Sequence, residues 1–202
     1  MSAVTQVFDR ISRVYDNQVI QALIYRPTQD QVLADVSLLG PARVLDVGCG
    51  TGQLTARIQS ELSVDLVYGC DPSSGMLAQA RARSTDVVWI EGKAEEVPLP
   101  SGSVEAVVST EAFHFFDQPA AMAEFHRLLA PGGHVIIGLL NPVTQAGSQI
   151  LDLPGAGHWP TRREMRDLLD GAGFDAVRQT HVRRPIGRLT PTYVTVGARR
   201  PV

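Results

Sequence analysis

The sequence predicts an α/β fold: a doubly wound, mostly parallel sheet of seven strands, with helices on both faces and an antiparallel last strand. From residue 42 onward, short apolar runs alternate with helical segments of about ten residues. This alternation is typical of right-handed crossover units in a parallel sheet. The last two apolar runs, 175–184 and 190–200, follow each other with no helix between them, so we expect them to pair as neighbouring strands joined by a turn around Pro185–Gly187.

The strands are expected where short apolar runs end at polar or turn-forming residues. They lie at 42–48, 64–71, 86–92, 104–110, 134–140, 175–184 and 190–200. The helices are expected where apolar residues recur at helical spacing, as Leu54, Ile58 and Leu62 do. They lie at 28–40, 52–62, 73–83, 118–129 and 161–173.

Local signals mark several helix ends. Gly40-Pro41 ends the first of these helices, and Pro131-Gly132-Gly133 stops the fourth. Ser73 is placed to cap the third helix, because a serine oxygen can accept from the first free backbone N–H groups. The last helix, 161–173, is likewise expected to be capped.

The length of 202 residues fits one domain, which we divide into an N-terminal helical cap (1–40) and a core (41–202). No apolar run is long enough to span a membrane, and the first residues are too charged for a signal peptide, so we expect a cytoplasmic protein without an integral membrane segment. The net charge of -3 argues against a nucleic-acid binder. The segment 161–202 nevertheless carries nine arginines against four acids, which leaves an acidic partner or substrate open beside a solvated basic face.

Two cysteines occur, Cys49 and Cys70, without metal-type spacing. We interpret them as reduced structural residues and expect no metal site.

The segment "VLDVGCGTGQLT", residues 44–55, predicts a ligand-binding loop between a strand and a helix. Its glycines, Gly48, Gly50 and Gly52, form G-x-G-x-G, whereas a nicotinamide-binding loop needs G-x-G-x-x-G and a P-loop needs a lysine that is missing here. Asp46 precedes the glycines, and a carboxylate is unfavourable next to phosphate oxygens at low dielectric. S-adenosylmethionine fits better, because its ammonium suits Asp46 and its carboxylate suits the N-terminus of the helix.

Asp71 provides a second test of the ligand. It ends the second strand, 19 residues after Gly52, where an acid can accept both ribose hydroxyls. An acid before the glycines combined with an acid after the second strand favours S-adenosylmethionine over the other nucleotides.

With these residues, the sequence resembles the class I S-adenosylmethionine-dependent methyltransferases, which have a Rossmann-like fold. It is most similar to the branch that includes ubiquinone, menaquinone and malonyl-carrier-protein methyltransferases. The segments that carry the resemblance are "VLDVGCGTG", "VYGCDPSSGMLAQAR", "EEVPLPSGSVEAVVSTEAFHFF" and "EFHRLLAPGGHVII", in this order. The N-terminal "FDRISRVYD" is similar to an element that covers the cofactor in the quinone-type enzymes.

The resemblance implies a cofactor site for S-adenosylmethionine, left as S-adenosylhomocysteine after transfer. The residues it assigns are Asp46, Gly48, Cys49, Gly50 and Gly52 for the methionine end, Asp71 for the ribose, Pro72 and Met76 beside the adenine, Ala94 and Glu95 at the adenine amino group, Ser109 and Thr110 near the sulfonium, and Tyr15 as a closing residue. Lys93 stands where the family often has an acid, and a lysine cannot accept from the adenine amino group.

The acceptor is expected at the loop "STEAFHFFDQP" after the fourth strand. His114 is the first candidate for a general base and Glu111 the second, although a carboxylate acceptor would need neither. His158 and Trp159 are candidates for an acceptor lid. We expect a small, partly apolar acceptor, free or presented by a carrier protein or a membrane surface. The alternative, a non-catalytic cofactor-binding subunit of the same fold, rests on Lys93.

Overall fold

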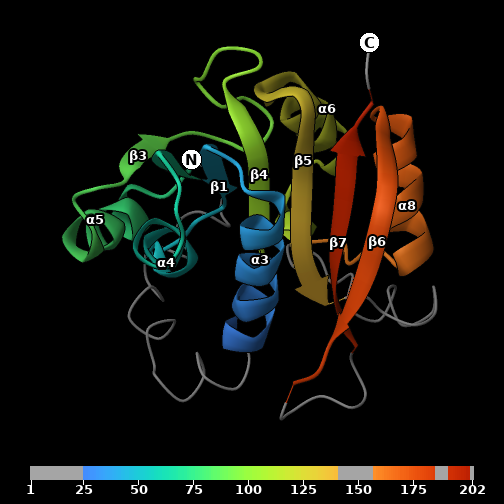
Figure 1. Ribbon diagram of the computed structural model, residues 1–202, viewed down its shortest axis with the longest axis horizontal. Helices are drawn as coiled ribbons and strands as arrows, with labels where there is room; N and C mark the ends of the chain where they lie inside the picture. Colours follow the sequence, from blue (N-terminus) through green and yellow to red (C-terminus); the bar gives the residue numbers. More distant parts are fainter. Residues whose placement is uncertain (1–24, 141–156, 185–190, 201–202) are drawn as a thin grey trace.

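The structure, a computed structural model, describes residues 25–140, 157–184 and 191–200 (Figure 1). Its sheet has seven strands in the order β3-β2-β1-β4-β5-β7-β6. The strands are β1 (Arg43–Val47), β2 (Leu66–Asp71), β3 (Val88–Glu91), β4 (Val104–Thr110), β5 (Leu129–Leu140), β6 (Phe174–Val182) and β7 (Thr192–Arg199). The helices are α3 (Arg26–Leu39), α4 (Gln53–Glu61), α5 (Ser74–Arg83), α6 (Gln118–Leu128) and α8 (Arg162–Gly171), with a short 3-10 turn η2 (Phe113–Phe115).

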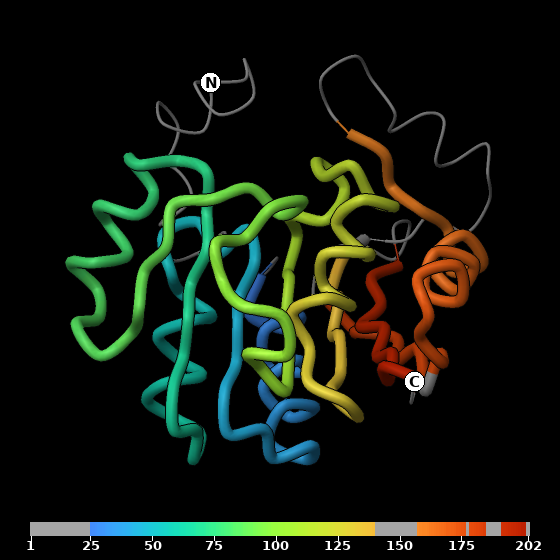
Figure 2. Tube along the Cα trace, turned by 90° about the horizontal axis from the view of Figure 1, so that it is seen from above, coloured from blue at the N-terminus to red at the C-terminus, as the bar shows by residue number. Residues whose placement is uncertain are grey.

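The strand directions confirm the predicted fold class. β1 to β5 pair in parallel, and β7 runs antiparallel between β5 and β6. The chain moves outward from β1 to β3 on one side and resumes at β4 on the other side of β1. In Figure 2 the segments of β2, β3 and α5 accordingly lie at one end of the sheet, and those of β6, β7 and α8 lie at the other. The carboxyl ends of β1 and β4 therefore flank the point where the strand order reverses, which is the usual ligand site of such sheets.

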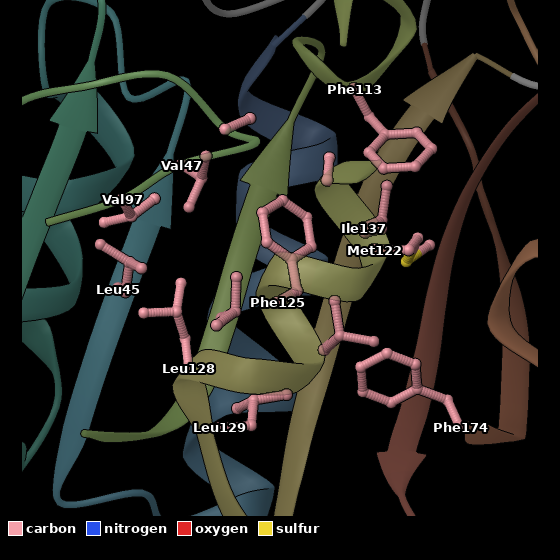
Figure 3. Packing of buried hydrophobic residues seen from close by; sticks show 14 of the residues in the cluster. Leu45, Val47, Val97, Phe113, Met122, Phe125, Leu128, Leu129, Ile137 and Phe174 are labelled. Atoms are coloured by element: carbon pink, nitrogen blue, oxygen red, sulfur yellow. The ribbon is translucent and has the colours of Figure 1, made fainter. Parts of the chain in front are cut away.

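Helices cover both faces of the sheet, because its central strands are apolar on both sides. One buried cluster joins the strands to α6 and α8 and contains Phe113, Met122, Phe125 and Phe174 (Figure 3). A second cluster joins the other face to α3 and α4, through side chains such as Val32 and Ile58.

The predicted helix ends are confirmed where a cap was expected. Gly40 closes α3 in the left-handed conformation (φ 60°), with its N–H bonded to the Val36 carbonyl at 2.9 Å. Ser73 Oγ accepts from the Met76 N–H at 3.1 Å and caps α5. Thr161 and Glu164 form a reciprocal capping box at the start of α8.

The predicted start of the fifth strand was wrong. Helix α6 ends at Leu128, before the Pro-Gly-Gly sequence, and Leu129 already pairs with Val104. Pairing then shifts and resumes at His134 opposite Ala106, so the residues between them form an irregularity within β5. Proline lacks an N–H for the ladder and Gly132 has a φ of 76°, which explains why pairing is interrupted there.

Of the predicted cap, the structure describes α3, which packs on β4, β5 and β7 through residues such as Val32 and Val36. The division of the domain at residue 40 stays a prediction. In the described part of the chain, no helix combines the length and the apolar character that crossing a membrane requires.

Candidate cofactor and acceptor site

A cavity of about 740 Å³ opens at the carboxyl ends of β1 to β4. Its volume is in the usual range for small-molecule sites. Eleven of the predicted cofactor residues line it: Asp46, Gly48, Cys49, Gly50, Asp71, Pro72, Met76, Lys93, Ala94, Glu95 and Thr110. They come from the carboxyl ends of β1, β2 and β4, from the loops after β1, β2 and β3, and from the first turn of α5. The parallel sheet brings these segments to one edge.

The glycine loop is held in place by backbone bonds to the next strand. The N–H groups of Gly48 and Cys49 both donate to the Cys70 carbonyl, at 2.8 and 3.1 Å. Gly48 has a φ of 70°, and a Cβ there would lie 2.5 Å from Ala112 Cβ. The loop therefore follows a path that only glycine permits at this position, with its backbone close to the cavity.

Asp46 is a buried carboxylate at the floor of the cavity. It is 2% exposed, and Oδ2 accepts from the Thr55 hydroxyl at 2.6 Å. Burial, and to a smaller extent the nearby charge of Asp71, raises the pKa of Asp46 to about 7, although the Thr55 bond opposes the shift. Burial disfavours the ionised form of Asp46, and a ligand cation beside the carboxylate would stabilise that form. This is the property expected of an ammonium site.

Asp71 is fixed by two backbone donors. Oδ2 accepts from the Gly50 N–H and Oδ1 from the Ser73 N–H, both at 2.9 Å. A carboxylate offers about four lone-pair positions, so each oxygen can accept more than one hydrogen bond. Asp71 thus joins the glycine loop to the start of α5 and presents a rigid pair of acceptors to the cavity.

Glu111 lines the cavity directly after β4. Its backbone has a φ of 52°, and its N–H donates to the Gly138 carbonyl at 2.8 Å. The carboxylate oxygen Oε1 accepts from Arg184 Nη2 and from Thr28 Oγ1, the latter at 3.4 Å. The side chains of Glu111 and Arg184 are 13% and 9% exposed, so this is a largely buried ion pair.

The comparisons with known proteins agree with this geometry. Residues 45–137, which run from within β1 into β5 and contain the glycine loop, match the family described as "Methyltransferase domain". A malonyl-[acyl-carrier protein] O-methyltransferase of Dechloromonas aromatica is 30% identical over 179 residues, covering 86% of this chain and 66% of that protein. The chain belongs to the class I S-adenosylmethionine-dependent methyltransferases.

Two further methyltransferases are similar to it. An uncharacterized methyltransferase of Mycobacterium tuberculosis is 44% identical over 93 residues, or 46% of this chain. The match spans 37% of the length of that relative. An S-adenosylmethionine-dependent methyltransferase of Thermotoga maritima has the same fold, with a TM-score of 0.77 and 22% identity over 98% of this chain and 100% of that chain.

Two of the family-assigned residues do not line the cavity. Gly52 stands at the N-cap of α4 with a φ of 75°, and a Cβ there would lie 2.4 Å from the Trp89 ring. Ser109 is fully buried in β4, whereas Thr110, which was assigned together with it, lines the cavity. Gly52 thus accommodates a tryptophan of β3, which spacing along the chain could not indicate. Tyr15 lies outside the described residues.

His114 is buried beside the cavity and does not line it. Its ring lies between Phe115, with centroids 3.9 Å apart, and Trp159, stacked at 4.2 Å. Burial lowers the pKa of His114 to about 4, so the imidazole is neutral at neutral pH. The geometry favours Glu111 over His114 as the residue that meets an acceptor, and both roles stay predictions.

The segment 157–160, a predicted lid, is bound to the loop after β4. The His158 N–H donates to the His114 carbonyl at 2.8 Å, and the His158 carbonyl accepts from Gln118 Nε2 at 2.7 Å. Trp159 faces His114, away from the cavity lining. This arrangement makes His158 and Trp159 a support for the aromatic loop.

Sequence reasoning missed several residues of the cavity. Tyr25 and Gln29 line it from the start of α3, and Phe115 and Phe116 line it from the acceptor loop. Tyr25 precedes the helix that was predicted to begin at residue 28. The observed helix begins at Arg26, with Tyr25 at its N-cap. Arg184, 73 residues from its partner Glu111, had no local signal.

The two cysteines behave as structural thiols. Burial raises the pKa of Cys70 to about 12 and that of Cys49 well above its ordinary value. The two thiols form no disulfide with each other. Among the described residues there is no group of His, Cys, Asp or Glu side chains suited to a metal ion.

Proposed function

We propose that this protein transfers the methyl group of S-adenosylmethionine to a small, partly apolar acceptor at oxygen, carbon or nitrogen. The observation that carries the proposal is the meeting of Asp46, the glycine loop and Asp71 around one cavity. Asp46 suits the methionine ammonium and Asp71 the ribose hydroxyls, while Pro72 and Met76 offer apolar contact to the adenine. Phe115 and Phe116 make the acceptor side of the cavity aromatic.

Methyl transfer needs an activated donor, alignment and exclusion of water. The sulfonium supplies the activation, so we expect an in-line displacement in which the acceptor lone pair attacks the methyl carbon and sulfur keeps the electrons of the broken bond. The enzyme would contribute mainly by holding both reactants at the correct distance in a dry site. Presentation of the acceptor by a carrier protein is consistent with the malonyl-carrier-protein relatives.

The first experiment measures the melting temperature with S-adenosylhomocysteine, NAD and ATP. At a hundredfold excess over its dissociation constant a ligand stabilises by about 2.7 kcal/mol, which corresponds to roughly 5–10 °C here. A rise with S-adenosylhomocysteine alone supports the proposal, and a rise with NAD alone overturns it. Transfer of labelled methyl to phenols, quinols and acyl carboxylates then tests the activity.

A second candidate is a non-catalytic cofactor-binding subunit of the same fold. The observation that favours it is Lys93, which lines the cavity where the family often has an acid. Binding of S-adenosylhomocysteine without methyl transfer to any acceptor of the panel would favour this candidate.

A further inference from the structure

Glu111 is held in a conformation that needs support from the fold. A positive φ is unfavourable for a residue with a side chain and costs about 1 kcal/mol or more. Glu111 keeps a φ of 52° immediately after β4, where its N–H is fixed by the Gly138 carbonyl of β5. Such strain is concentrated at functional sites, because it aims a side chain that a relaxed backbone would direct elsewhere.

Two side chains, Arg184 and Thr28, restrain the carboxylate itself. Arg184, which follows β6, donates to Glu111 Oε1 and also to Thr28 Oγ1, at 2.8 Å in the second case. Thr28 belongs to α3 and donates to the same Oε1. Thr28 is fully buried, and the two charged side chains are nearly so. The carboxylate therefore has a fixed direction at the cavity wall.

The described lining of the cavity is acidic. Five carboxylates line it: Asp46, Asp71, Glu91, Glu95 and Glu111. Lys93 is the one cationic side chain among the described lining residues, and Arg184 lies behind Glu111 rather than in the lining. A substrate carboxylate beside Glu111 would meet a like charge in a partly desolvated part of the cavity. A substrate N–H or O–H could instead donate a hydrogen bond to the Glu111 carboxylate.

We propose that Glu111, positioned by Arg184 and Thr28, selects the acceptor, and that it selects acceptors with an N–H or O–H at the reacting atom over carboxylates. The inference rests on the proposed methyltransferase function and names its substrate class. In the step, the acceptor nitrogen or oxygen lone pair forms the bond to the methyl carbon. The carbon–sulfur bond breaks with its electrons on sulfur, giving neutral S-adenosylhomocysteine. The methylated acceptor then loses a proton to water. An amine that binds as its ammonium form must first lose a proton, because the ammonium has no lone pair with which to attack.

The test compares three probes that share an aromatic body: benzylamine, benzyl alcohol and benzoate. S-adenosylhomocysteine is first titrated into the full-length protein by calorimetry, and the probes are then titrated into the saturated complex. We expect the amine or the alcohol to bind at least about tenfold more tightly than benzoate. Benzoate binding equal to or tighter than both, or no response to any probe, overturns the inference. Failure of the first titration instead overturns the cofactor assignment.

Three variants assign the preference to Glu111. Glu111→Gln keeps an oxygen for Arg184 and Thr28 but removes the charge, and it should reduce the preference to within about threefold. Glu61→Gln removes an exposed carboxylate of α4 outside the cavity lining and should leave the preference intact. Arg184→Lys should retain the preference, with weaker binding of the favoured probe, since an ammonium holds a carboxylate less rigidly than a guanidinium.

A double variant covers the case in which Glu111→Gln lowers stability. Glu111→Gln with Arg184→Met removes both charges and must show the same loss of preference. An unchanged preference in both overturns the role of Glu111.

Discussion

At the scale of single residues, two carboxylates at the ends of neighbouring strands have contrasting surroundings. Asp46 is buried with one hydroxyl donor, and its pKa is raised to about 7. Asp71 receives two backbone N–H groups, one of them from the glycine loop. Asp46 is therefore suited to respond to a cation, whereas Asp71 is suited to hold a fixed hydrogen-bond geometry.

The raised pKa of Asp46 predicts a stability cost in the unliganded protein. The folded state binds this proton more tightly than the unfolded chain, so the stabilisation is complete below about pH 4 and is lost as the pH rises to about 7. Asp46→Asn should accordingly raise the free energy of unfolding at pH 8, by roughly 2–4 kcal/mol. Urea denaturation at several pH values measures this effect. A gain of equal size at pH 4 would contradict it.

The same residue predicts a pH dependence of ligand binding. An ammonium beside Asp46 favours the ionised carboxylate, so the affinity for S-adenosylhomocysteine should fall as the pH drops below about 7, by at most tenfold per pH unit. Calorimetric titration from pH 5 to pH 8 measures the profile. Asp46→Asn should bind more weakly at pH 8 and without this dependence. A wild-type profile that is flat over the range would remove Asp46 from the ammonium site.

Asp71 predicts a large loss of affinity on truncation. Asp71→Ala should weaken S-adenosylhomocysteine binding at least about tenfold, because two ribose hydroxyls and the N–H groups of Gly50 and Ser73 lose their acceptor. Asp71→Asn keeps one acceptor oxygen and should have an intermediate effect. Calorimetry on both variants, with exposed Asp175→Ala as the control, measures it. Unchanged affinity in Asp71→Ala would refute the assignment of the ribose.

At the scale of elements, the turn between β1 and α4 depends on β3. Gly52 and Gly69 both have the Trp89 ring within 2.5 Å of where a Cβ would stand, and Trp89 Nε1 donates to the Ser84 carbonyl at 3.0 Å. The tryptophan thus lies flat over two glycines of neighbouring elements. This packing keeps the start of α4, and with it the glycine loop, in register with the sheet.

Gly52→Ala tests that packing. The new methyl group would clash with Trp89 and would need a left-handed conformation, so we expect a destabilisation of about 2–4 kcal/mol. Gly171→Ala is the matched control, because nothing lies within 4 Å of its Cβ position and its φ is not positive. Denaturant unfolding compares the two variants. Equal effects would show that the Trp89 contact is unimportant.

At the scale of the whole molecule, the core and the cavity share side chains. Phe116 lines the cavity, and its ring meets Phe125 edge-on at 6.5 Å, while Phe125 is fully buried in the cluster beneath α6 (Figure 3). Aromatic packing therefore connects the acceptor side of the cavity to the centre of the fold.

Phe125→Ala should consequently lower both stability and binding of an aromatic acceptor. A fully buried phenylalanine replaced by alanine costs about 3–5 kcal/mol. Leu38→Ala, at a side chain 73% exposed on α3, should stay within about 0.5 kcal/mol. Thermal and urea unfolding measure both. If Phe125→Ala lowers the free energy of unfolding by less than about 1 kcal/mol, the neighbouring side chains must fill the cavity that the ring leaves, and the prediction is wrong.

The sequence by itself determined the order of the elements, the caps of α3, α5 and α8, and the carboxylates Asp46 and Asp71 at the cavity. These features depend on periodicity, on capping residues and on the rule that parallel strands end at one edge, and all of them are local or follow from chain order. The same residues favoured S-adenosylmethionine as the ligand, and the family resemblance added the residues assigned to its adenine and sulfonium.

Only the tertiary structure decided the rest. The ion pair of Glu111 with Arg184, the role of Gly52 under Trp89 and the burial of His114 against Trp159 join residues 37 or more positions apart. Such contacts depend on the strand order and on which side chains meet when the faces of the sheet are covered. The sequence placed the acceptor at the loop after β4, but no pattern of neighbouring residues shows which partners position Glu111 or bury His114.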